Sequence, residues 1–169
     1  MFFPDFPHKF GIMKPDMPIA KRRPLRFINL YPPFLGAGIR VKRIADDLCT
    51  VDVEMALRFW NRNYVGTHFG GSLYSMCDPF FMLILTSNLG PDYIVWDKAA
   101  TIRFKKPGKG LMKATFHIPH QTIEEIRAQA DLQAKVEPQF QTVVTDIEGT
   151  IIAEVDKLLY VRKKDKERR

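Results

Sequence analysis

Cysteine is scarce in this chain of 169 residues, which contains only Cys49 and Cys77. Two isolated thiols make neither a disulfide framework nor a cysteine-based zinc motif, and a domain of this length can bury a core without them. Long hydrophobic runs are lacking too, because the longest strongly apolar stretch, 79–86, is far shorter than the roughly 20 residues that cross a bilayer. We therefore expect one globular domain with no membrane span, in a reducing compartment such as the cytoplasm.

Several catalytic and targeting signals are also missing. The chain has neither a G-x-S-x-G nucleophile elbow nor a G-x-G-x-x-G dinucleotide fingerprint. His117 and His120 are three residues apart, but the proline between them opposes a helix and no further ligands complete a metal site, so no metal is expected. The aromatic N-terminus is broken by prolines at positions 4, 7, 15 and 18, a pattern unlike a secretory signal.

Positive charge is confined to the two ends of the chain. Residues 1–43 carry nine basic and two acidic side chains, residues 161–169 carry six and two, and the middle carries eleven and fifteen. A nucleic-acid binder has its basic face within the fold, so this pattern predicts no nucleic-acid partner. The basic run 21–23 could instead meet the phosphates of an anionic cofactor or a membrane surface, whereas 162–164 is best interpreted as a solvated tail.

The hydrophobic pattern predicts an α+β domain. Alternating residues predict a strand hairpin over 39–55, strands over 93–104 and 112–118, and two more over 140–147 and 151–161. The segment 72–89 is apolar nearly all round and ends at Gly90-Pro91, so we expect a long buried central helix. Capping-box spacing at Thr122 and Glu125 predicts a second helix that runs to about residue 133. The expected architecture is one antiparallel sheet that wraps around the central helix.

These elements suggest three parts of the chain. Residues 1–36 form an N-terminal arm that packs on the domain or on a partner subunit, residues 37–162 form the domain, and residues 163–169 form a basic C-terminal tail.

The loop before the central helix contains Asn63, Gly66, Gly70 and Gly71, and Asp78 follows in the helical segment. This order resembles the N-x-x-G-x-x-H-G-G pattern of the hot-dog thioesterases of the phenylacetate-pathway type. Phe69 stands where that family has its histidine, and His68 is displaced by one residue. The closer resemblance is to the thioesterase-like family DUF4442. It covers nearly the whole chain, including Arg62-Asn63-x-x-Gly66-Thr67-x-Phe69-Gly70-Gly71, the segment 94–100 and the terminal run 160–162.

The resemblance implies a hot-dog fold and hydrolysis of acyl-CoA thioesters, with CoA entering only as part of the substrate. It also implies a homo-oligomer, a dimer or a dimer of dimers, in which two protomers pair their sheets and the site forms at their junction. Asp78 would activate water or attack the thioester, and Asn63 would position water or the carbonyl. Substrate contacts are expected from Gly66, Thr67, His68, Phe69 and Ser75.

The chemistry of the individual residues agrees with these roles. Gly70 and Gly71 enter the first turn of the expected helix, where backbone N–H groups lack intrahelical partners and can hold an oxyanion. Asp78 falls on the same helix face as Gly71, so partial burial would favour its action as a base. Lys98 shares strand parity with Ala100, and we expect it to point inward and either pair with Asp78 or orient substrate.

Other interpretations stay open at this point. Asn63 could simply cap a turn, and Asp78 could be a structural charge paired with Lys98 or Arg103. Because Phe69 replaces the family's histidine, a non-catalytic acyl-CoA or fatty-acyl binding protein of the same fold is an alternative function. A hydratase or dehydratase is a second alternative, and it would require His68 to serve in place of that histidine.

Overall fold

The structure is a computed structural model that describes residues 27–164. The basic run 21–23 and most of the expected N-terminal arm lie outside these residues. The helical elements are η1 (Ile28–Leu30), α2 (Pro32–Ala37), α3 (Gly70–Ser75), α4 (Phe80–Leu89) and α5 (His120–Leu132). The strands are β1 (Ile39–Ile44), β2 (Thr50–Ala56), β3 (Tyr93–Phe104), β4 (Leu111–His117), β5 (Gln139–Thr145) and β6 (Ile151–Lys163).

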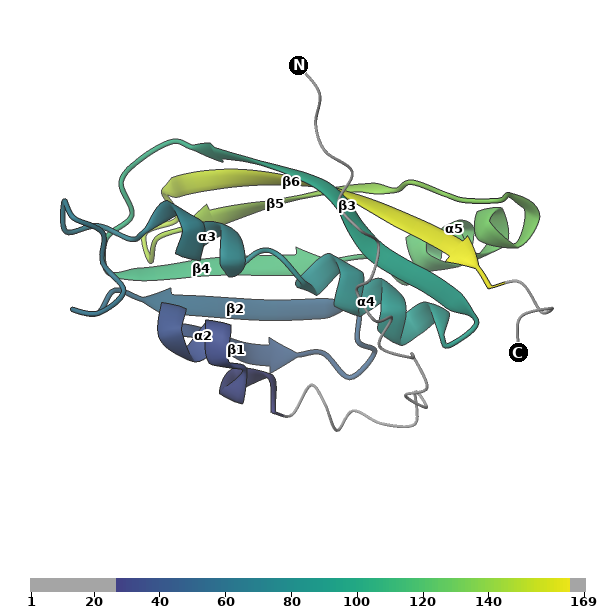
Figure 1. Cartoon of the computed structure of the whole chain (residues 1–169), viewed down its shortest axis with the longest axis horizontal. Coiled ribbons are helices and arrows are strands. Elements are labelled where there is room, and N and C mark those ends of the chain that lie inside the picture. The colour runs from purple at the N-terminus through teal and green to yellow at the C-terminus, as the bar shows by residue number, and fades with distance from the viewer. Residues whose placement is uncertain (1–26, 165–169) are drawn as a thin grey trace, which may run out of the picture.

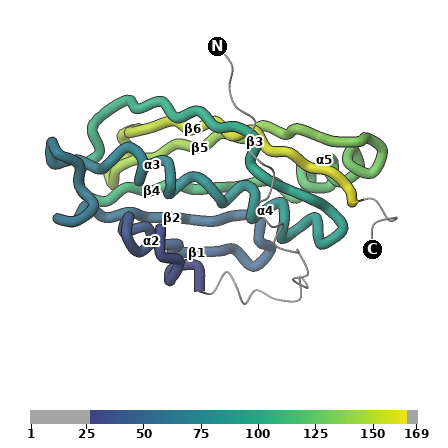
Figure 2. Tube along the Cα trace, in the orientation of Figure 1, coloured from purple at the N-terminus to yellow at the C-terminus, as the bar shows by residue number. Residues whose placement is uncertain are grey.

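The six strands form one antiparallel sheet in the order β1-β2-β4-β5-β6-β3. It curls around α3 and α4, and β3, at the edge of the sheet, runs above the two helices in the view of Figures 1 and 2. The predicted α+β architecture, a sheet wrapped around a central helical segment, is confirmed. The predicted hairpin is present as well, since β1 pairs with β2 in a register that places Val41 opposite Val53.

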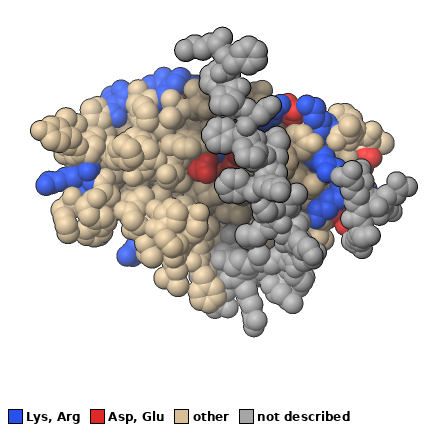
Figure 3. Space-filling model, in the orientation of Figure 1, with Lys and Arg blue, Asp and Glu red and all other residues tan. Residues whose placement is uncertain are grey.

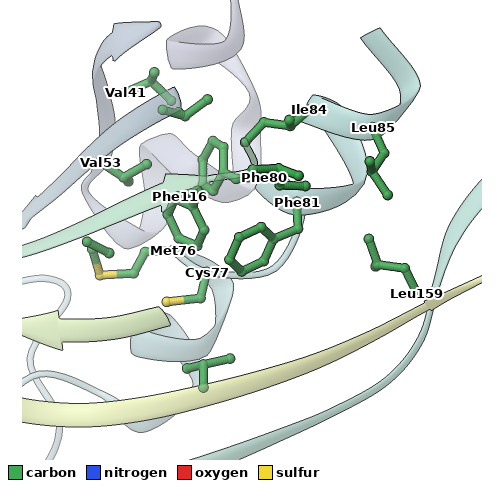
Figure 4. Packing of buried hydrophobic residues seen from close by; sticks show 14 of the residues in the cluster. Val41, Val53, Met76, Cys77, Phe80, Phe81, Ile84, Leu85, Phe116 and Leu159 are labelled. Carbon is green, nitrogen blue, oxygen red and sulfur yellow. The ribbon is translucent and has the colours of Figure 1, made fainter. Parts of the chain in front are cut away.

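The core lies between α4 and the concave face of the sheet (Figure 4). Phe80 and Phe81 of α4 are fully buried and pack on Phe116 of β4, with ring centroids 4.8 and 5.3 Å apart. Leu159 of β6 closes the core on its other side. Aromatic burial of this extent supplies much of the free energy that holds a helix against a sheet.

The central helical segment differs from the expected single helix over 72–89. It is divided into α3 and α4, with a break over residues 76–79. The physical cause is Pro79, which has no N–H to donate to the preceding turn and disfavours helical geometry in the residue before it. Asp78 therefore lies in this break rather than on the face of a continuous helix.

The start of α5 also differs from the expectation. The helix begins at His120, with Pro119 as its N-cap in an extended conformation and no side-chain hydrogen bond at the cap. Thr122 and Glu125 are thus inside the helix, and their capping-box spacing is coincidental. Proline fixes a backbone angle suited to the entry of a helix, so the chain turns helical directly after it.

Candidate active site

Asn63 organises the loop that enters α3. Its Oδ1 accepts hydrogen bonds from the backbone N–H groups of Val65 (3.1 Å) and Thr67 (3.0 Å). Its Nδ2 donates to Thr67 Oγ1 (2.8 Å) and to the carbonyl of His68 (3.2 Å). Gly66 takes a positive φ of 80° at the tip of this turn, where a side chain would be strained. The geometry supports the turn-capping interpretation of Asn63, and its contact with substrate stays a prediction.

His68 ties the same loop to the turn between β3 and β4. Its Nε2 lies 2.9 Å from the carbonyl oxygen of Gly110, and its backbone N–H donates to the carbonyl of Gly108 (2.9 Å). Because a carbonyl can only accept, Nε2 carries the proton, and Nδ1 is buried with no hydrogen-bond partner among residues 27–164. Burial lowers the pKa of His68, so the ring is neutral. With 3% of its surface exposed, His68 has no access to substrate unless the loop moves.

Two aromatic rings lie against the glycines at the start of α3. A Cβ atom at Gly70 would come within 2.9 Å of Phe104 Cζ, and one at Gly71 within 2.4 Å of Phe69 Cε1. These distances are shorter than any ordinary carbon contact, so the glycines are what lets both rings approach the helix. Phe69, which stands where the N-x-x-G-x-x-H-G-G pattern has its histidine, is 57% exposed.

Asp78 is held at one oxygen and open at the other. Its Oδ1 accepts a hydrogen bond from the hydroxyl of Tyr74 (2.8 Å) and another from the ammonium of Lys157 (2.9 Å). Within residues 27–164 no hydrogen bond reaches Oδ2, and the side chain is 48% exposed. The carboxylate is thereby fixed in orientation while keeping one oxygen for a ligand or a water molecule.

Lys157 is the residue that the sequence reasoning missed. Its side chain is completely buried, and its ammonium lies 2.9 Å from Asp78, 3.1 Å from Asp97 and 3.3 Å from the hydroxyl of Tyr74. Burial alone would lower the pKa of Lys157, but the bond to Asp78 and the charges of Asp78 and Asp97 outweigh it and raise the pKa above its usual value. The sequence could have predicted its burial, because Lys157 alternates with the apolar residues Val155 and Leu159 along the expected strand and so shares their inward face.

The expected ion pair between Lys98 and Asp78 is not formed. Lys98 Nζ instead contacts Glu137 (2.8 Å), and Lys157 takes the place next to Asp78. The cause is a β-bulge in β3, where Asp97 pairs with Leu159 and Ala99 with Leu158, leaving Lys98 as the extra residue.

The bulge breaks the strand parity on which the prediction for Lys98 rested. Before it, Asp97 faces the helices together with Tyr93 and Val95, and after it Ala100 and Ile102 do so. Arg103, the other partner considered for Asp78, bonds to Glu154 and Asp156 on the outer face of the sheet.

Serine and threonine of the expected binding set have internal roles. Thr67 is buried and accepts the hydrogen bond from Asn63 described above. Ser75 donates its hydroxyl hydrogen to the carbonyl of Gly71, one turn earlier in α3 (2.8 Å). Their contact with substrate stays a prediction.

Residues 27–164 contain no group of three or more His, Cys, Asp and Glu side chains that could hold a metal ion. None of the helices in these residues is both long and apolar enough to cross a bilayer.

The sheet curled around α3 and α4 is the hot-dog fold, and comparison with solved structures agrees. A Pseudomonas aeruginosa protein of unknown function, described as a probable thioesterase, has a TM-score of 0.70 at 21% identity, over 76% of this chain and 85% of that one. A thioesterase from Haemophilus influenzae has a TM-score of 0.61 at 11% identity, over 88% and 95%. The Escherichia coli PaaI protein of the phenylacetic acid degradation operon has a TM-score of 0.55 at 18% identity, over 78% and 83%.

The family itself follows from the sequence. Residues 23–161 match the family described as domain of unknown function DUF4442, and this chain belongs to that family. No curated protein matches the sequence.

Proposed function

We propose that this protein is an acyl-CoA thioesterase. The observation that carries the proposal is the geometry of Asp78, whose Oδ1 is anchored by Tyr74 and Lys157 while Oδ2 is free to accept a proton. A general base needs this combination of fixed orientation and an accessible lone pair. The thioesterases of the same fold add support at the level of the superfamily.

In the proposed reaction, Asp78 Oδ2 takes a proton from a water molecule as the water oxygen bonds to the thioester carbonyl carbon. The carbonyl electrons move onto oxygen to give a tetrahedral oxyanion, for which the first-turn N–H groups of Gly70 and Gly71 are the candidate donors. When the carbonyl re-forms, the carbon–sulfur bond breaks. The CoA thiolate leaves and takes up the proton that Asp78 removed from water, which restores the Asp78 carboxylate, and the carboxylic acid is released.

The spacing of these groups favours a site shared between two protomers. Gly70 and Gly71 begin α3, whereas Asp78 lies beyond its last residue, Ser75, in the break before α4. A carbonyl group held by the N–H groups at the start of α3 is separated from Asp78 of the same protomer by the length of this six-residue helix, about 9 Å. We therefore propose a homodimer in which the glycines of one protomer and Asp78 of the other meet the same thioester.

The CoA phosphates would meet basic residues at the end of the molecule where β2 ends and α3 begins, on the left of Figure 1. Lys105, Lys106 and Lys109 lie in the turn between β3 and β4, and Arg58 and Arg62 lie in the neighbouring loop. The backbone N–H of Leu57 donates to the carbonyl of Gly110 (2.8 Å), which joins the two segments. On the face drawn in Figure 3, Lys and Arg side chains gather mainly toward the ends of the molecule.

The test is thiol release from short, long and aryl acyl-CoAs by the wild type, Asp78→Ala and Asp78→Asn. We expect hydrolysis of at least one substrate class by the wild type and a loss of about 100-fold or more in both variants, the usual contribution of a general base. Glu148→Gln, in the exposed turn between β5 and β6, is the control and should retain full activity.

A second candidate function is that of a non-catalytic acyl-CoA binding protein. It is favoured by Phe69, which replaces the histidine of the N-x-x-G-x-x-H-G-G thioesterase pattern with a side chain that cannot transfer protons. No thiol release from any acyl-CoA, together with calorimetric binding of acyl-CoA that survives Asp78→Asn, would establish this alternative. A hydratase or dehydratase receives no support, because His68, the histidine of the loop before α3, is buried and bonded to Gly110.

A further inference from the structure

A base that is paired with a buried ammonium group is a weak base. The positive charge stabilises the ionised carboxylate, and a carboxylate that ionises too readily takes a proton from water poorly. Lys157 is such an ammonium, with no exposed side-chain surface and a hydrogen bond to Asp78. The structure contains a second carboxylate that counteracts this effect, that of Asp97.

Asp97 reaches Lys157 because of the bulge in β3. In a regular strand Lys98 would be the inward residue next to Ala100, whereas the extra residue lets both Asp97 and Ala100 face the helices. Asp97 Oδ1 lies 3.1 Å from Lys157 Nζ, a close ion pair that lacks the geometry of a hydrogen bond. Burial raises the pKa of Asp97, Lys157 opposes that effect, and the charge of Asp78 adds to it.

We infer that Lys157 and Asp97 are positioning residues for Asp78: Lys157 holds Oδ1 in place, and Asp97 takes up part of its positive charge. The inference rests on the proposed function, in which Asp78 is the base. Asp78 and Asp97 share the ammonium of Lys157. Lys157 therefore orients Asp78, but stabilises its ionised form less than it would if Asp78 were its single partner.

Titratable side chains face Lys157 from several of the elements around it, while β5 places Phe140 opposite it in the sheet. The break over 76–79 contributes Asp78 and Cys77, α3 contributes Tyr74, and β3 contributes Asp97. Burial raises the pKa of the Cys77 thiol to about 12, and burial together with Asp78 raises the pKa of Tyr74, so both groups are neutral near pH 7. The ionisable groups left to interact are Lys157, Asp78 and Asp97, one ammonium between two carboxyl groups.

The sharing of charge predicts opposite effects for two substitutions on the acid limb of the pH profile of kcat/KM. Asp97→Asn leaves Lys157 entirely to Asp78, so the midpoint of the acid limb should move down by about one pH unit. Lys157→Met leaves two adjacent carboxylates that share a proton, so the midpoint should move up by about one unit or more. A residue that only supports packing would lower the rate without moving the midpoint.

Lys98→Met is the matched control. Lys98 is the neighbour of Asp97 in the chain, but it is exposed and forms its ion pair with Glu137. This variant should leave the midpoint unchanged. Shifts in the same direction for Asp97→Asn and Lys157→Met, or an unshifted midpoint in Asp97→Asn, would overturn the inference. If Lys157→Met fails to fold, the comparison of Asp97→Asn with the wild type decides the matter alone.

A readout independent of turnover separates this inference from the proposed function. Carbon-13 NMR of labelled aspartate carboxyls follows Asp78 directly, with its signal assigned by its loss in Asp78→Asn. We expect Asp78 to titrate at lower pH in Asp97→Asn than in the wild type, even if no acyl-CoA is hydrolysed. An unchanged titration would reject the inference and leave the proposed function standing or failing on its own test.

Discussion

His68 and Cys77 are both buried, and burial shifts their pKa values in opposite directions. The pKa of the Cys77 thiol rises to about 12, while the pKa of His68 falls, and each shift favours the neutral form. A neutral buried thiol is unreactive, and a neutral imidazole with one buried, unpaired nitrogen is a structural group in this conformation. At the scale of single residues, the proposed chemistry therefore depends on Asp78 and the groups bonded to it rather than on His68 or Cys77.

The low pKa of His68 makes stability depend on pH. Below the pKa of an exposed histidine, about 6.5, the unfolded chain binds a proton that the folded protein excludes. Stability from this residue is therefore fully present above about pH 6.5 and is lost as the pH falls through the lower folded value. His68→Gln, whose amide can still donate to Gly110, should show a shallower decline in unfolding free energy between pH 7 and pH 5 than the wild type.

Chemical denaturation at several pH values measures this decline. His120→Gln, at the exposed start of α5, is the matched control and should follow the wild type. Parallel curves for the wild type and His68→Gln would show that His68 takes up no proton on unfolding.

At the scale of elements, Arg127 of α5 contacts the C-terminal end of α4. Arg127 donates from Nη1 to the carbonyl of Leu89 (2.8 Å) and from Nη2 to that of Asn88 (2.7 Å), the last carbonyls of α4. Those groups have no partners within their own helix, and a cation at a helix C-terminus also interacts favourably with its dipole. The two helices are thus joined at the end of α4 farthest from Asp78.

Loss of this contact should be measurable as stability. Arg127→Ala should lower the free energy of unfolding by about 2 kcal/mol, since hydrogen bonds that involve a charged group are worth more than neutral ones. Glu124→Gln removes the ion pair of Arg127 with Glu124 (3.1 Å) and keeps the helix contact, so it should cost much less. Equal losses in the two variants, measured by urea denaturation, would assign the effect to the ion pair instead.

The same scale shows what sequence patterns can and cannot predict. The alternation of apolar and polar residues predicted the strands because each strand has one face on the core, as Val51, Val53 and Met55 show. The glycine loop and Asp78 were found in a different way, by the order of these residues along the chain. The bulge in β3 was missed, because an extra residue leaves no mark on composition and reverses every parity argument beyond it. The break at Pro79 could have been predicted, since proline disfavours helix continuity.

Considered as a whole, the molecule leaves one long strand at the edge of its sheet. β3 is paired with β6 on one side only, and Ala99, Ala100 and Thr101 at its middle are exposed. An exposed edge of this length can pair with another strand, and a second β3 running antiparallel would continue the sheet. The proposed dimer would use this edge and bring Asp78 of one protomer toward the glycines of the other.

A charge on this edge should disrupt the proposed dimer. We expect the wild type to elute with twice the mass of the chain in size exclusion with light scattering, and Thr101→Lys to shift toward the monomer and lose thioesterase activity together. Gln129→Lys, which adds the same charge on the exposed side of α5, should remain a dimer. A monomeric wild type that hydrolyses acyl-CoA would reject the shared site.

The single ammonium shared by Asp78 and Asp97 also has an evolutionary consequence. Loss of Lys157 alone leaves two adjacent carboxyl groups without their shared cation, and loss of Asp97 alone changes the strength of the proposed base. Divergence at these positions should therefore proceed by paired replacements, with the lysine and the second aspartate gained or lost together. Relatives that have neither residue would need another group to orient the carboxylate at the position of Asp78, and in this chain the hydroxyl of Tyr74 already provides one such contact.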